Sequence, residues 1–211
     1  LGFKSRKVMC IRYYGLNHFG WWTSIKDKVG KEYIQDLIKH QLKYGNCLAD
    51  DDASNYTDSS WFDTAKKVKD IIAIDPTMCP NSYFQYYLFG DDMVAHTDPN
   101  YTRADQVVDT REKRVFGECA RIEKVGTAKD TTLQIGIHAE FIVDLATALA
   151  FNTHERMLLI VPNNGAISNF ENDAMVETPC IVGKDGYEPL TLGEIPHFQK
   201  GLMEQQVNCE K

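Results

Sequence analysis

The sequence predicts an α+β domain that combines a mixed β-sheet with long helices. Three short segments have the composition of β-strands, at residues 8–14, 157–161 and 175–182. Longer segments, whose apolar residues recur at helical spacing, occupy much of the chain between them. Because strands and helices do not alternate regularly, the pattern favours an α+β arrangement. The 211 residues can form one compact domain, so we expect a single domain over residues 1–211.

The first strand is predicted at residues 8–14, where β-branched and aromatic residues predominate. Gly15 and Gly20 follow, and two glycines so close together are expected to break the strand pattern. His18 lies between them, so we expect it just past the end of a strand.

Four helices are predicted from the spacing of apolar residues and from residues that typically begin or end a helix. Asp75-Pro76 ends the second of them, because the residue before a proline avoids helical geometry. The polar residues 46–60 read as a surface loop or a helix lead-in, and Pro80 opens an aromatic segment at residues 83–89. The predicted helices cover residues 31–44, 61–74, 103–124 and 139–151.

The second half of the chain contains the other two predicted strands. Residues 157–161 are continuously apolar and are followed by Pro162-Asn163-Asn164-Gly165, which suits a buried strand and a tight turn. The chain closes inside an amphipathic pattern that has no capping glycine or proline, and it opens with Leu1 rather than Met. We therefore expect a fragment of a longer protein.

The composition argues against several classes of function. A formal net charge of -7 gives no general attraction to nucleic acid or to an anionic membrane, because both require clustered positive charge. No apolar run approaches the roughly 20 residues that span a bilayer. The six cysteines form no CxxC pair, which favours reduced thiols and a cytoplasmic location.

No self-contained catalytic motif is present in the sequence. A glycine-rich dinucleotide loop after a strand, a Walker loop, an HExxH and a GxSxG are all missing. From the residues alone, the prediction stops at a cytosolic α+β domain.

Several long segments resemble one enzyme family in the same order along the chain. Gly15-Leu16-Asn17-His18, within residues 12–22, resembles the GLNH segment of glycoside hydrolase family 4, in the version found in 6-phospho-α-glucosidases. The further matching segments are residues 80–88, 100–104, 155–161 and 195–206. The resemblance covers essentially the whole chain.

The resemblance implies the C-terminal domain of a lactate/malate dehydrogenase-like fold, without its N-terminal Rossmann half. Similar enzymes carry, shortly before the position of Leu1, a Cys-Asp-Met-Pro segment with a metal-ligating cysteine and the acid for the leaving group. The implied cofactors are NAD and a divalent metal, usually Mn²⁺. NAD⁺ takes a hydride from C3 of the sugar, a base then removes the C2 proton, and elimination, water addition and hydride return follow.

The resemblance also implies roles for four residues. His18 would ligate the metal, which suits a neutral imidazole, and Asn17 would orient that ring or contact the sugar. Tyr83 would be the base that removes the C2 proton, a role in which a nearby metal must assist a phenol whose ordinary pKa is near 10. Arg103 would grip the sugar 6-phosphate with its forked guanidinium.

The predicted function is hydrolysis of phosphorylated α-glucosides such as maltose 6'-phosphate by a homo-oligomer, a dimer or a tetramer. We expect the chain alone to be inactive, because the hydride acceptor site would lie upstream. One alternative is a hydroxy-acid dehydrogenase-like protein, which would share the fold and use a histidine base without a metal. Another is a non-catalytic truncated domain that only associates with partner subunits.

Overall fold

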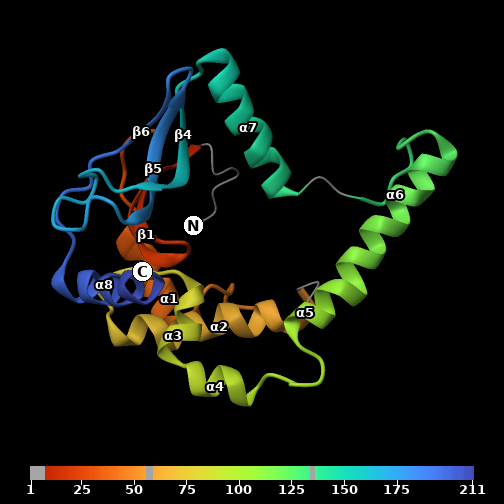
Figure 1. Cartoon of the computed structure of the whole chain (residues 1–211). Helices are drawn as coiled ribbons and strands as arrows, with labels where there is room; N and C mark the ends of the chain where they lie inside the picture. The colour runs from red at the N-terminus through yellow and green to blue at the C-terminus, as the bar shows by residue number, and fades with distance from the viewer. Residues whose placement is uncertain (1–7, 56–58, 134–135) are drawn as a thin grey trace.

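The structure is a computed structural model that describes residues 8–55, 59–133 and 136–211. A six-stranded sheet lies on one side of the molecule, and Figure 1 shows helices below it and beside it. The strand order is β3-β2-β1-β5-β4, with β6 pairing with β5, and every pairing between these strands is antiparallel. Parallel pairing is limited, in the part of the chain described, to an isolated bridge between Ile167 and Gly193. The predicted combination of α and β structure is confirmed.

Strands β1 (Cys10–Leu16) and β2 (Phe19–Lys26) form a tight hairpin. Its two-residue turn is Asn17-His18, with φ of 35° and 72°, the left-handed geometry that matches the twist of paired strands. The predicted position of His18 past a strand end is confirmed. The prediction that Gly15 and Gly20 break the strand is wrong, because they pair with each other inside the hairpin.

The two hairpin glycines are required by a close approach of the strands. A Cβ on Gly20 would lie 2.4 Å from the Tyr14 carbonyl oxygen and 2.5 Å from the Tyr13 phenol oxygen. A Cβ on Gly15 would lie 2.4 Å from the Cα of Gly20. No side chain fits at either position without moving the backbone, so the glycines hold the turn that carries His18.

We expect Gly20→Ala to lower the free energy of unfolding of this chain by at least about 2 kcal/mol, because an added methyl group overpacks the hairpin. Gly201→Ala is the matched control, since a Cβ at this position in a helix meets nothing within 4 Å. That change should stabilise the chain by about 0.5 to 1 kcal/mol. Chemical denaturation of the three proteins measures both effects, and equal stabilities for Gly20→Ala and the unmodified chain would contradict the prediction.

The other long strands are β4 (Glu155–Pro162) and β5 (Met175–Gly183), which confirms the strands predicted at residues 157–161 and 175–182. The prediction that β4 is buried throughout is wrong. Met157 and Val161 are buried, but Leu158 and Ile160 are 37% and 46% exposed, because successive side chains of a strand point to opposite faces of the sheet. Strand β2 and the short strands β3 (Cys79–Pro80) and β6 (Gly186–Pro189) were not among the predicted elements.

The main core lies between one face of the sheet and the helices α2 (Ser59–Ile74) and α8 (His197–Glu210). Trp21 and Val176 from the sheet meet Ile71 from α2 and Met203 from α8 in this core. Helix α1 (Ile34–Tyr44) packs with α2 in a second cluster through Ile38 and Ile72. The helices predicted at residues 31–44 and 61–74 are confirmed.

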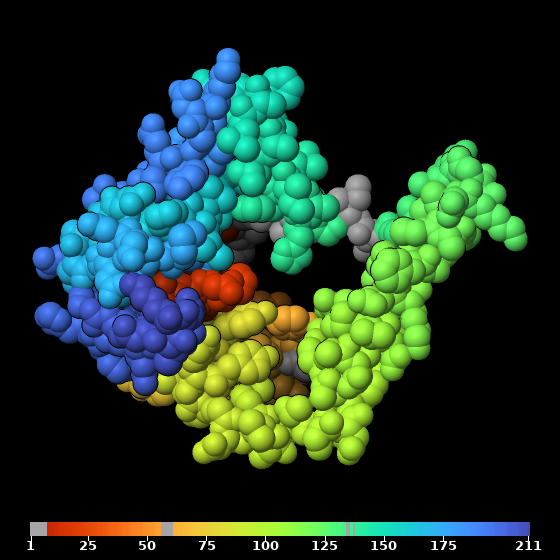
Figure 2. Space-filling view, in the orientation of Figure 1, coloured from red at the N-terminus to blue at the C-terminus, as the bar shows by residue number. Residues whose placement is uncertain are grey.

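The helix predicted at residues 103–124 is a continuous arm. It consists of α5 (Arg103–Gln106), a π-helical turn (Val107–Glu112) and α6 (Lys113–Val125). Figure 1 shows α6 extending away from the rest of the molecule, and Figure 2 shows an opening between this arm and α7 (Ile137–Phe151). The red atoms of the N-terminal strands lie at the edge of that opening in Figure 2.

The remaining helices are short and follow β3. They are a 3-10 turn (Ser82–Phe84), α3 (Gln85–Leu88) and α4 (Gly90–Ala95), with a further 3-10 turn at Ala53–Asn55. No helix in the described ranges is long and apolar enough to cross a membrane. The thiols of Cys10, Cys79, Cys119, Cys180 and Cys209 form no disulfide.

Candidate active site

The tip of the β1–β2 hairpin presents His18 to solvent and to one buried carboxylate. The His18 side chain is 51% exposed, and its Nδ1 lies 3.6 Å from Glu177 Oε1. The backbone N–H of His18 donates to Glu177 Oε2 at 2.7 Å. Glu177 therefore holds the turn by a hydrogen bond to its backbone, and its carboxylate faces one side of the imidazole ring.

Glu177 lies on β5, where it pairs with Gly15 of β1 and is only 6% exposed. From this position its carboxylate reaches the backbone N–H of His18 in the hairpin turn. A buried carboxylate requires such partners, since burial without them is costly. The phenol of Tyr13 lies close by, and its pKa is raised chiefly by burial and then by the charge of Glu177.

Glu177 is a residue that sequence reasoning missed. It lies 159 positions from His18 along the chain, and no local spacing connects the two. The signal that could have singled it out is its own position, as the one charged residue in the predicted strand at residues 175–182.

Tyr83 lies beside His18, with the ring centroids 5.1 Å apart. It sits in the 3-10 turn after β3, where the Asn81 side chain accepts from the Tyr83 backbone N–H at 3.1 Å. The Asn81 N–H in turn donates to the Gly20 carbonyl at 2.9 Å, which ties this turn to the hairpin. The Tyr83 side chain is 39% exposed. The structure thus brings together two candidate residues from separate segments.

Asn17 and Arg103 occupy different places relative to this pair. Asn17 is exposed in the hairpin turn, next to His18 in the chain. Arg103 begins α5, after a capping box formed by Thr102 and Asp105, and its Nη1 donates to Gln106 Oε1 at 3.1 Å. Figure 1 shows α5 at the foot of the arm, apart from β1. A ligand that touches both His18 and Arg103 would have to extend between them.

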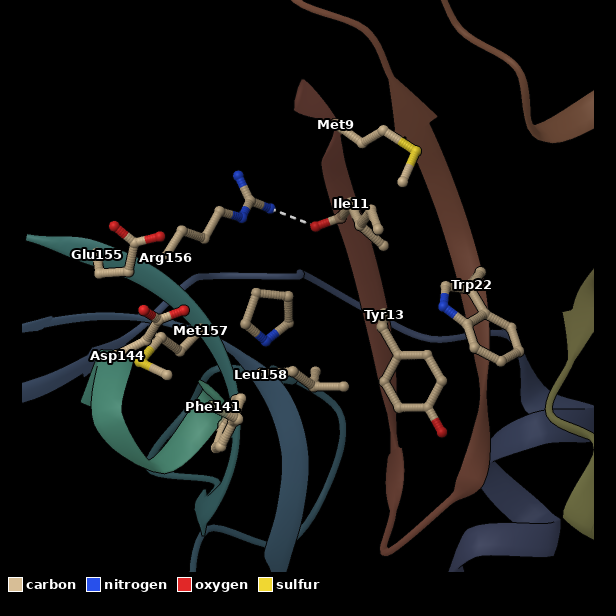
Figure 3. Close-up of a pocket in the computed structure, with 11 residues that line it drawn as sticks. Met9, Ile11, Tyr13, Trp22, Phe141, Asp144, Glu155, Arg156, Met157 and Leu158 are labelled. Carbon is tan, nitrogen blue, oxygen red and sulfur yellow. Dashed lines mark hydrogen bonds between the residues drawn. The ribbon is translucent and has the colours of Figure 1, made fainter. Parts of the chain in front are cut away.

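A recess of about 290 Å³ lies on the sheet near this site. Figure 3 shows Tyr13 and Trp22 of the hairpin facing Arg156 of β4 across it, with Phe141 of α7 at the lower edge. An Arg156 Nη2 donates to the Ile11 carbonyl at 2.6 Å. His18 and Tyr83 are not among the residues that line it. The candidate chemistry therefore lies outside the recess, at the exposed hairpin tip, and we assign it from the side-chain contacts.

The residues at the hairpin tip fit one part of a metal site. An imidazole whose Nδ1 faces a carboxylate keeps Nε2 open for a metal, an arrangement common in metalloproteins. Across residues 8–55, 59–133 and 136–211, no three His, Cys, Asp or Glu side chains cluster to hold an ion. His18 could thus supply one ligand, and the other donors would have to come from substrate, water or other residues.

Comparison with known proteins identifies the family. Residues 13–211 match the model of the family 4 glycosyl hydrolase C-terminal domain. The chain belongs to this family. The sequence is 56% identical over all 211 residues to maltose-6'-phosphate glucosidase MalH of Clostridium acetobutylicum and covers 48% of it. It is 56% identical to the 6-phospho-alpha-glucosidase of Leptotrichia buccalis, again over the whole chain and 48% of the relative. The chain spans about half the length of these relatives.

Solved structures of the family agree with the fold. A 6-phospho-alpha-glucosidase from gut microorganisms, in complex with NAD and Mn²⁺, matches with a TM-score of 0.87 and 40% identity. The match covers 98% of this chain and 47% of that one. The 6-phospho-beta glucosidase from Thermotoga maritima matches with a TM-score of 0.67 at 21% identity, which concerns the fold alone. The predicted relation to the C-terminal half of family 4 enzymes of the 6-phospho-α-glucosidase kind is confirmed.

Proposed function

We propose that this chain is the metal- and substrate-binding half of a 6-phospho-α-glucosidase that uses NAD and Mn²⁺ and hydrolyses sugars such as maltose 6'-phosphate. The observation that carries the proposal is the contact between the rings of His18 and Tyr83. The buried carboxylate of Glu177 faces the same imidazole. The activities of two relatives at 56% identity support the substrate class, and a related structure bound to NAD and Mn²⁺ supports the cofactors.

The residues of this chain would have separate tasks in that reaction. NAD⁺ and Mn²⁺, when bound, supply hydride transfer at C3 and stabilisation of negative charge on the sugar oxygens. His18 would hold the metal through Nε2, while Glu177 fixes the orientation of the ring through Nδ1. Tyr83, beside His18, would take the proton from C2. Asn17 would contact the sugar or help to orient His18, and Arg103 would bind the 6-phosphate.

The proposal is tested with a chimera in which this chain replaces the matching 48% of MalH from Clostridium acetobutylicum, below called the MalH chimera. We expect the chimera to hydrolyse maltose 6'-phosphate only when NAD⁺ and Mn²⁺ are both present. The 211-residue chain by itself should show no turnover under the same conditions. An inactive but folded chimera, or an active isolated chain, would contradict the proposal.

Glu177→Gln should weaken Mn²⁺ binding by the MalH chimera about 10- to 100-fold, because a neutral amide then replaces the carboxylate that faces His18 Nδ1 and orients the ring. Titration of Mn²⁺ against activity and against calorimetric binding measures the effect. Glu188→Gln, at an exposed position on β6, is the matched control and should change neither. Unchanged Mn²⁺ affinity in Glu177→Gln would show that Glu177 only holds the turn.

Arg103→Ala should weaken binding of the phosphorylated sugar about 10- to 150-fold, because a charge-assisted bidentate contact contributes about 1.5 to 3 kcal/mol. Arg103→Lys should recover only part of the loss, since an ammonium cannot reproduce the fork. The measurement is kcat/KM of the MalH chimera for 4-nitrophenyl α-glucoside and its 6-phosphate. Arg111→Ala, also exposed on the arm, is the control. Equal losses on both substrates would make Arg103 structural.

We also propose that the whole protein is a cytoplasmic homo-oligomer. Large apolar side chains are exposed on the arm and on α7, among them Phe116 at 67%, Ile142 at 65% and Phe151 at 77%. Large apolar side chains exposed on two helices are typical of surfaces that contact another subunit. Light scattering from the MalH chimera would refute this part of the proposal if it gave the mass of a monomer.

A further inference from the structure

Tyr86 is an exposed aromatic residue next to Tyr83 and His18, and it has no role in the function proposed above. It lies on α3, directly after the turn that carries Tyr83, and its side chain is 54% exposed. The ring centroids of Tyr83 and Tyr86 are 5.8 Å apart, with the planes tilted by 56°. The Tyr83 ring therefore contacts both the His18 ring and the Tyr86 ring.

The neighbouring Tyr87 differs from Tyr86 in its surroundings. Its ring packs edge-on against Phe19 with the centroids 4.5 Å apart, and Phe19 in turn packs on the buried Phe84 at 4.3 Å. Tyr87 is thus joined to the aromatic core below the hairpin, although it is half exposed. The Tyr86 ring packs against Tyr83 and not against this core, so Tyr86 extends the exposed site and Tyr87 does not.

We propose that Tyr86 binds the leaving sugar, the ring attached at C1 of the phosphorylated glucose, and so contributes to substrate specificity. This inference rests on the proposed function. C1 is adjacent to C2, the carbon that Tyr83 would deprotonate, so an aromatic ring in contact with Tyr83 is placed to reach the group on C1. The apolar C–H face of a sugar ring packs on an exposed aromatic face, and the phenol hydroxyl leaves a polar edge in water.

The test compares two substrates of the MalH chimera that differ only in the leaving group, maltose 6'-phosphate and methyl α-glucoside 6-phosphate. Tyr86→Ala should lower kcat/KM for the disaccharide about 3- to 10-fold more than for the methyl glucoside, which has no second ring. Tyr86→Phe should restore the value for the disaccharide to within about twofold, because the aromatic face remains. Tyr187→Ala, at another exposed tyrosine, on β6, should leave the ratio unchanged.

Equal losses on both substrates, or no loss on either, would overturn the role of Tyr86. If the unmodified chimera hydrolysed neither substrate, the proposed function would be at fault, and Tyr86 would be tested by binding. In that case the isolated chain, with ¹³C-labelled tyrosine, is titrated with maltose 6'-phosphate and with glucose 6-phosphate. The Tyr86 ring signals should shift with the disaccharide only, and identical shifts or none would also overturn the inference.

Discussion

Replacing His18 with alanine in the MalH chimera should abolish hydrolysis of maltose 6'-phosphate, with a loss of at least about 10²-fold, because a ligand contributes more than the groups that only orient it. His18 is the exposed imidazole of the hairpin tip, and its Nδ1 already faces Glu177. Its removal would take away the imidazole nitrogen that this chain would supply to the metal. Excess Mn²⁺ should restore little activity, since the remaining donors cannot also hold the sugar.

The control is His138→Ala, because His138 is an exposed histidine on α7 and belongs to none of the contacts at the hairpin tip. The two variants should have the same stability to heat but different Mn²⁺ content after dialysis. If His18→Ala kept near-normal activity and a full complement of Mn²⁺, His18 would not be a ligand, and the buried Glu177 would have to be explained as a turn anchor alone.

Replacing Tyr83 with phenylalanine should lower kcat about 10²-fold or more, while KM for the sugar and binding of NAD⁺ change little. The substitution removes one oxygen and keeps the ring that packs beside His18 at 5.1 Å. The loss should therefore reflect the proton transfer and not a collapse of the site. In D₂O, the unmodified chimera should incorporate deuterium at C2 of the product, and the variant should not.

Tyr87→Phe provides the comparison, since Tyr87 makes its ring contact with Phe19 and its hydroxyl has no task in the proposed reaction. That variant should incorporate deuterium at C2 at the normal rate. Normal exchange in Tyr83→Phe as well would place the base elsewhere, with Tyr86 to be tested next.

Local patterns predicted most of the fold. Helical spacing located the arm and α7, and apolar runs located β4 and β5, because these elements depend on residues close together in sequence. The hairpin was missed for a physical reason. Gly15 and Gly20 look like strand breakers in the sequence, but they are needed where two backbones approach too closely for a Cβ.

The candidate site was only partly predictable from the sequence. Family resemblance selected His18 and Tyr83, and the fold places their rings in contact. Resemblance did not select Glu177, whose partnership with His18 depends on the pairing of β5 with β1 across most of the chain. Arg103 stays a prediction, because it lies on the arm and its role depends on how a bound sugar extends from the hairpin tip.

The most direct test of this account is the position of the metal in a crystal of the MalH chimera grown with Mn²⁺, NAD⁺ and glucose 6-phosphate. Anomalous scattering at the manganese edge should show one peak at bonding distance from His18 Nε2, with Glu177 still facing Nδ1. The Tyr83 hydroxyl should point toward C2 of the sugar in the same map. A manganese peak bound by other residues, with His18 turned away from it, would contradict the account.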